Sequence, residues 1–130
     1  MFPKAARFVL GGDTIVWHHG RGLGKPKSRA EALRMLRGLV GKKHAVYTGL
    51  AIWDRKIGRV LTGCAKTDVW MKPVVEAWLQ NYVDTIHPFD KAGAYAIQAK
   101  LKIVRKIQGS YSNVVGLPKE LLRKMLKELG

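Results

Sequence analysis

The sequence predicts a single α/β domain over residues 1–130, in which a mixed, twisted sheet is flanked by helices. Apolar runs typical of strands alternate along the chain with segments whose apolar residues recur at helical spacing. One pair of these runs is joined by a short turn, which predicts a hairpin within the sheet. The length of 130 residues suits one domain, and a hydrophobic content of 47% is enough to bury a core.

The first predicted element is an apolar strand over residues 7–17. Gly11 and Gly12 interrupt it, and such a break predicts a bulge or a close approach of a ligand to the backbone. A loop rich in glycine and basic residues follows. The capping-box pattern from Ser28 to Glu31 then predicts a helix that ends near Val40.

A hairpin comes next along the chain. Residues 45–53 are apolar at successive positions, which favours a strand covered on both faces, and residues 59–71 supply its partner strand. The lone cysteine, Cys64, lies in the second strand and is interpreted as a small core residue. The four tryptophans have apolar neighbours, so we interpret them as core residues rather than as a platform for stacking bases.

The second half of the chain predicts two helices and a short strand. In order, these are a helix from Pro73 to about Val83, a loop with a short helical turn over 90–99, a strand over 101–107, a loop over 109–116 and a last helix beginning at Pro118. Both helices start at a proline, a residue that suits the first helical position because its missing N–H is not needed there.

The charge of the chain predicts a polyanionic partner. Twenty-four Lys and Arg against nine Asp and Glu give a net charge of +15. The excess lies at both ends, because residues 1–43 carry +8 and residues 100–130 carry +6, whereas residues 44–99 carry +1. Phosphate groups are the partner expected first, and solvated helix faces are the ordinary alternative.

Cellular location is inferred from the cysteine count and from the hydropathy of the chain. A single cysteine excludes an internal disulfide and favours a reducing compartment. No apolar stretch approaches the ~20 residues that cross a bilayer, and no secretory cleavage pattern follows the first residues. We therefore expect a cytoplasmic protein with no membrane partner.

Three places carry side chains suited to phosphate chemistry. Asp13 interrupts an apolar strand, where it is either a metal ligand or base for water, or a turn aspartate bonded to backbone amides. Lys25 and Lys27 precede the helix that begins near Ser28, and phosphate binds well at a helix N-terminus. Residues 90–98 gather polar groups around small residues, but alone they indicate only a turn.

Six segments, taken in order, carry a resemblance to a known family. They are Gly12-Asp13-Thr14, Leu23-Gly24-Lys25-Pro26-Lys27, Glu31-Ala32 to Leu36, Val46-Tyr47-Thr48-Gly49, Asp90-Lys91-Ala92-Gly93-Ala94-Tyr95 to Gln98, and Gly109-Ser110-Tyr111-Ser112-Asn113 to Pro118. Over nearly the whole chain the sequence resembles the Maf family of nucleoside triphosphate pyrophosphatases, also called septum formation inhibitors. The resemblance implies a Maf/ITPase-like fold and a divalent metal, Mg²⁺ or Mn²⁺. It also implies hydrolysis of a nucleoside triphosphate to the monophosphate and pyrophosphate.

The resemblance also implies roles for particular residues. The residues implied as catalytic are Asp13, which also binds the metal, Lys25 of the Gly-Lys-Pro motif and Gln98 of the Ile-Gln motif. The residues implied as substrate-binding are Thr14, Lys27, Lys91 and Tyr95. The segment 90–98 looks like the branch of the family that acts on dTTP and UTP, and modified nucleotides are further candidate substrates.

The sequence departs from the family pattern in two places. No Ser-x-Arg-Arg stretch occurs, so the resemblance implies an N-terminally truncated fold without the family's first strand and phosphate-binding loop. Ala96 and Ala99 stand where the family has glycine. One alternative is therefore an inactive Maf-like scaffold that binds RNA or DNA through its basic ends. Another is a chain that folds only as an oligomer, such as a homodimer, whose partner covers an exposed sheet edge.

Overall fold

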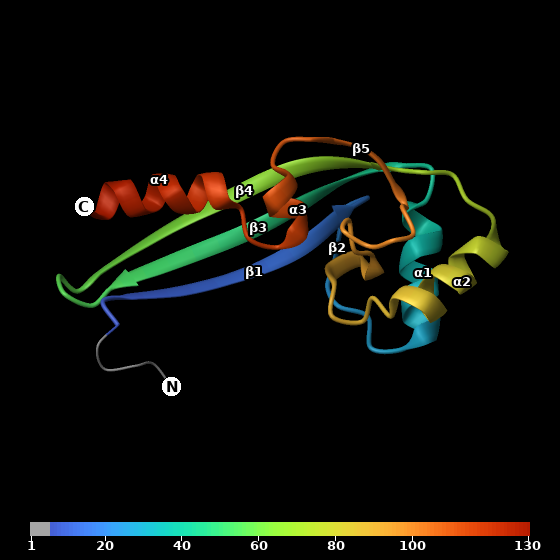
Figure 1. Ribbon diagram of the computed structural model, residues 1–130, viewed down its shortest axis with the longest axis horizontal. Coiled ribbons are helices and arrows are strands. Elements are labelled where there is room, and N and C mark those ends of the chain that lie inside the picture. The colour runs from blue at the N-terminus through green and yellow to red at the C-terminus, as the bar shows by residue number, and fades with distance from the viewer. Residues whose placement is uncertain (1–5) are drawn as a thin grey trace.

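The computed structural model describes residues 6–130, which form a five-stranded sheet with helices packed on it (Figure 1). The strands are β1 (Phe8–His18), β2 (Arg21–Leu23), β3 (Lys43–Asp54), β4 (Arg59–Met71) and β5 (Val104–Gln108). Their order in the sheet is β2-β1-β3-β4-β5, and every described pairing is antiparallel. The predicted α/β fold with flanking helices is confirmed, with an antiparallel rather than a mixed sheet.

The helices gather at two places along the long strands. They are α1 (Arg29–Leu39), α2 (Glu76–Ile86), α3 (Tyr111–Val115) and α4 (Lys119–Leu129), with a 3₁₀ turn η1 (Ala92–Ala94). Figure 1 shows α1, α2 and η1 at one end of the sheet, and α4 along the other end. Within residues 6–130, none of the helices is long and apolar enough to cross a membrane.

The sheet has two unlike faces, because successive side chains of a strand point to opposite sides. The covered face contains Val16, Val46 and Val69, which are buried with the apolar side chains of α1 and α2 in the main core. At the far end of the same face, Leu50 and Ile52 pack against Met125 and Leu129 of α4 in a second core. The open face contains the aromatic residues Trp17, Tyr47, Trp53 and Trp70.

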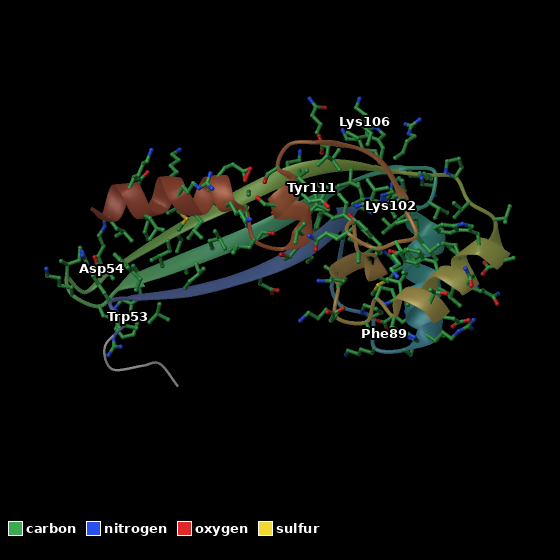
Figure 2. All side chains as sticks on the ribbon, viewed as in Figure 1. Trp53, Asp54, Phe89, Lys102, Lys106 and Tyr111 are labelled. Atoms are coloured by element: carbon green, nitrogen blue, oxygen red, sulfur yellow. The ribbon has the colours of Figure 1, made fainter. Side chains whose placement is uncertain are left out.

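The local sequence signals explain the first helix and the hairpin. The Ser28 hydroxyl accepts a hydrogen bond from the Glu31 N–H at 3.1 Å, which confirms the predicted N-cap of α1. The pairing of β3 with β4 confirms the predicted hairpin. At the hairpin end, the Arg7 guanidinium donates two hydrogen bonds of 3.0 Å to Asp54, which lies beside Trp53 in Figure 2. This ion pair lowers the pKa of Asp54 and fixes the start of β1 against the turn.

Several predictions about the strands are wrong. Gly11 and Gly12 form no bulge, because the β1–β3 register continues through both residues. A Cβ on Gly12 would lie 2.9 Å from the Leu50 side chain, so close packing favours glycine here, and the alternative of a close ligand approach stays a prediction. The outer face of β3 is not covered, since Trp53 is 40% exposed, and Cys64 is exposed on that same face rather than buried.

The predicted boundaries in the second half also need correction. Helix α2 begins at Glu76 rather than at Pro73, because the backbone of Lys72 is hydrogen-bonded to Gly41 and Ile103 and the N-cap residue Val75 is still extended. Residues 109–116 are not only a loop, since they contain α3. Pro118 is the N-cap of α4 rather than its first helical residue. The short helical turn predicted within 90–99 is confirmed by η1.

Candidate active site

A cleft of about 260 Å³ opens beside the middle of β1. Five parts of the chain line it. They are Gly12, Asp13, Thr14 and Val16 of β1 with Val46 of β3, Lys25 of the loop after β2, Asp90, Lys91, Ala92 and Tyr95 around η1, and Val114, Val115 and Gly116 at the end of α3. Opposite charges and hydrogen-bonding groups therefore meet above two apolar core residues.

The carboxylate of Asp13 is held at the free edge of β1. Strand β2 pairs with β1 only at residues 16–18, so the outer edge beside Thr14 has no partner strand among the described residues. The N–H of Thr14 donates instead to Asp13 Oδ1 at 2.9 Å. The Thr14 hydroxyl also lies 2.8 Å from the hydroxyl of Thr48, which ties this part of β1 to β3. The carboxylate is exposed, oriented and next to the cleft.

A glycine brings the Lys25 loop and the η1 segment together. The N–H of Gly93 donates to the carbonyl of Gly24 at 3.1 Å, one residue before Lys25. Gly93 has a φ of +73°, and a Cβ there would lie 2.8 Å from a methyl carbon of Val16. Only glycine meets both conditions without strain, because other residues disfavour positive φ and would clash here. Gly93 therefore allows the segment that carries Asp90 and Lys91 to pack closely on β1.

Tyr95 reaches the cleft from a buried position, where it is paired with His44. The Tyr95 hydroxyl lies 2.6 Å from His44 Nε2, and the two rings meet edge to face at 5.3 Å. Burial, together with a smaller effect of the neighbouring His18, lowers the pKa of His44 to about 4. Burial also raises the pKa of the Tyr95 hydroxyl. Both groups are therefore neutral at pH 7, and their hydrogen bond fixes the ring of Tyr95 at the cleft.

Buried side-chain hydrogen bonds position the end of α3. The side-chain amide of Asn113 donates to the carbonyl of Val46 at 3.1 Å and to the hydroxyl of Thr67 at 3.0 Å. At the start of the helix, the hydroxyls of Ser110 and Ser112 donate to Glu120 at 2.8 and 2.7 Å. Hydrogen bonding from the two serines lowers the pKa of Glu120. A helix of five residues needs such anchors, because it is too short to be stable by itself.

The structure brings together most of the site residues that the sequence predicted. Asp13, Thr14, Lys25, Lys91 and Tyr95 all line the cleft. Two other predicted residues do not line it. The backbone N–H of Lys27 donates to Glu31 at 3.3 Å, and Gln98 is exposed in a turn three residues after Tyr95. The roles of these two residues stay predictions.

Asp90 lines the cleft beside Lys91 but is not among the site residues that the sequence predicts. The two side chains form an ion pair of 4.0 Å between Asp90 Oδ2 and Lys91 Nζ. The available signal is that this second carboxylate lies next to the predicted Lys91 in the sequence. The signal is weak, because a loop sequence does not show which of its side chains face a site.

The cleft offers two carboxylates to a metal ion. Within residues 6–130, no group of three or more His, Cys, Asp or Glu side chains forms a ready-made metal site. Mg²⁺ in phosphate-binding sites needs fewer protein ligands, since one or two carboxylates share it with water and with phosphate oxygens. Asp13 and Asp90 therefore fit a metal that is bound together with a phosphate substrate.

Comparison with known proteins assigns the chain to a family. A family model described as Maf-like protein matches residues 2–129. The chain belongs to the Maf family. This confirms the resemblance carried by the six segments, which include the cleft residues Asp13, Lys25 and Tyr95.

Curated relatives of this Maf chain share a name and are longer than it is. The dTTP/UTP pyrophosphatase of Geotalea uraniireducens (strain Rf4) is 48% identical over 88% of this chain and 60% of its own length. The protein of that name from Geobacter sp. (strain M21) is 50% identical over 86% of this chain and 58% of its own length. That from Clostridium botulinum (strain Loch Maree / Type A3) is 43% identical over 100% of this chain and 68% of its own length.

Proposed function

We propose that this Maf chain hydrolyses a nucleoside triphosphate to the monophosphate and pyrophosphate, with dTTP or UTP as the preferred substrate. The observation that carries the proposal is the meeting of Asp13, Lys25, Lys91 and Tyr95 at one cleft, although they come from distant parts of the sequence. The names of the relatives, at 43–50% identity, support the choice of dTTP or UTP.

The charges at the cleft suit the reaction. A water molecule attacks the α-phosphorus, the bond to the bridging oxygen breaks, and pyrophosphate leaves with the electron pair of that bond. Lys25 and Lys91 would contact the phosphate oxygens on which negative charge increases. Asp13, held at the free strand edge by the Thr14 N–H, would orient the attacking water and accept its proton.

Maf-family pyrophosphatases generally need a divalent metal, and Mg²⁺ or Mn²⁺ is proposed here. Asp13 and Asp90 are the residues that would hold it, together with phosphate oxygens. When bound, such an ion neutralises phosphate charge and polarises the scissile bond. Thr14 and Tyr95 supply hydrogen-bonding groups at the cleft for the nucleotide. Outside the residues that line the cleft, Lys27 is proposed as a further substrate contact and Gln98 as a further catalytic residue.

Pyrophosphate release tests the proposal. Wild-type protein would be assayed with dTTP, UTP and the other common nucleoside triphosphates, with Mg²⁺ and with Mn²⁺. We expect release from dTTP or UTP that falls by about a hundredfold or more in Asp13→Asn and in Lys25→Met, because each removes a charged group from the reacting phosphates. Absence of release from every nucleotide would refute the proposed activity.

Matched variants control for general effects of charge. Glu128 and Lys124 are both exposed on α4, and neither lines the cleft. Glu128→Gln and Lys124→Met repeat the two charge changes at a distance, so both should retain wild-type turnover. If they lost as much activity as the cleft variants, the activity would not depend on this cleft.

The cellular location, the domain organisation and the oligomeric state are also proposed. The exposed thiol of Cys64 suits a reducing compartment, which supports the cytoplasm as the place of action. The family match over residues 2–129 supports one Maf domain over residues 1–130. The open edge of β1 from Phe8 to Ile15 would be the surface available to a second copy in a homodimer.

A further inference from the structure

The open face of the sheet lacks a covering layer within residues 6–130. The helices of the two cores lie on the other face, which contains Val16, Val46 and Leu50. On the open face, Trp17 is 45% exposed and Ile15 is 40% exposed. Large exposed apolar surface of this kind marks an interaction site more often than chance.

Three aromatic side chains form one corner of the open face. Trp17 of β1 lies opposite Ala45, and Tyr47 of β3 is the next residue along on the same face. Trp70 of β4 lies opposite Lys43, two residues from Ala45 in the other direction. Residues two apart in a strand share a face, so Trp17, Tyr47 and Trp70 lie on the same face of three adjacent strands. We name these three residues the aromatic corner.

Lysine ammonium groups lie over two rings of the aromatic corner, those of Trp70 and Tyr47. The ammonium nitrogens of Lys43 and Lys106 lie 5.3 and 4.8 Å from the ring centroid of Trp70, and that of Lys66 lies 5.9 Å from the ring of Tyr47. Lys106 belongs to β5 and projects from the upper edge of the molecule in Figure 2. Asp68 is acidic in the same region and contacts Lys43 at 3.6 Å and Lys66 at 4.0 Å. The corner therefore combines the exposed Trp17 ring and the half-buried Tyr47 and Trp70 rings with an excess of positive charge.

We propose that the aromatic corner binds single-stranded nucleic acid. Bases would stack on the rings, of which Trp17 is the most exposed, while Lys43, Lys66 and Lys106 would contact the phosphates. Charge complementarity favours this partner over a second copy of the chain, because each copy carries a net charge of +15. The site lies on the sheet surface and uses none of the residues that line the cleft.

Binding of a fluorescein-labelled twelve-residue oligouridylate, measured by fluorescence anisotropy, tests this site without any nucleotide turnover. Three phosphate contacts predict that the logarithm of the association constant falls with the logarithm of the salt concentration, with a slope of about −2. Trp17→Leu keeps an apolar side chain but removes the stacking surface, so the Kd should rise roughly 5- to 100-fold. Lys66→Glu with Lys106→Glu should weaken binding at least as much.

The matched control changes the same charge elsewhere. Lys124 and Lys127 are exposed on α4, which packs on the covered face. The double variant Lys124→Glu and Lys127→Glu should keep a Kd within about threefold of the wild type. Circular dichroism would establish that each variant is folded, and Tyr47→Leu replaces Trp17→Leu if that variant is not.

Three results would overturn the proposal. One is absence of binding by the wild type at 50 mM salt. The second is equal weakening by the two double-lysine variants, which would show that net charge alone holds the oligonucleotide. The third is a dimer by light scattering that Trp17→Leu abolishes while oligonucleotide binding is unchanged, since a second copy would then occupy the open face.

Discussion

The buried pair of His44 and Tyr95 predicts how the protein responds to mild acid. His44 is 3% exposed, and its pKa of about 4 in the folded state lies well below the ordinary 6.5. Between these two values the unfolded chain binds a proton at His44 that the folded chain does not bind. The free energy of unfolding is therefore unaffected above pH 7 and decreases as the pH falls from 6.5 towards 4.

The size of this effect follows from the two pKa values. The full difference between the folded and unfolded pKa values corresponds to about 3 kcal/mol of the free energy of unfolding, of which about 2 kcal/mol is lost between pH 7 and pH 5. Carboxylates contribute little in this window because they titrate mainly below pH 5. Burial also lowers the pKa of His18, which adds a loss of the same sign. The comparison must therefore isolate His44 from His18.

Urea denaturation of the wild type and of His44→Gln at pH 7 and pH 5 makes this comparison. Glutamine keeps a hydrogen-bonding group near the position of Nε2 but does not titrate, and His18 is present in both proteins. We expect the wild type to lose about 2 kcal/mol more than His44→Gln between the two pH values. Equal losses would refute the inference that His44 is held neutral by burial.

Three further substitutions test how the cleft and its supports are built, each by urea denaturation at pH 7. Gly93→Ala should lower the free energy of unfolding by at least about 1 kcal/mol, because an alanine there combines a positive φ with a contact of 2.8 Å to Val16. An unchanged urea midpoint would contradict the close approach of Gly93 to Val16. Asn113→Ala should cost about 1–3 kcal/mol by leaving the buried Val46 carbonyl without this donor, and a neutral result would show that water replaces it. Ser28→Ala should cost about 1 kcal/mol through loss of the N-cap of α1, whereas Ser28→Asn should cost little.

Local patterns predicted the elements whose causes are themselves local. The cap at Ser28 and the turn between β3 and β4 are short-range features, and both are found in the structure. The antiparallel character of the sheet could not be predicted, since it depends on which distant strands pair. The exposure of Cys64 and Trp53 could not be predicted either. A strand that is apolar at successive positions has the same sequence pattern whether one face or both faces of the sheet are covered.

The site was predicted from a resemblance between ordered segments, and the structure supplies the physical reason why those segments occur together. The residue type and sequence position of Asp13 are compatible with either a metal ligand or a turn residue, because its environment depends on the free edge of β1. The role of Gly93 depends on Val16, which is far away in sequence. His44 gave no signal at all, because its importance lies in a bond to Tyr95 fifty-one residues later.

The two proposed sites use the sheet in different ways, and this difference separates their tests. The cleft needs irregular backbone, because Gly93 and the short α3 helix must bring distant loops against one strand edge. The aromatic corner needs only the regular register of β1, β3 and β4, which places Trp17, Tyr47 and Trp70 on one face. A substitution such as Gly93→Ala should therefore impair turnover while oligonucleotide binding persists. Trp17→Leu should do the reverse, because Trp17 does not line the cleft.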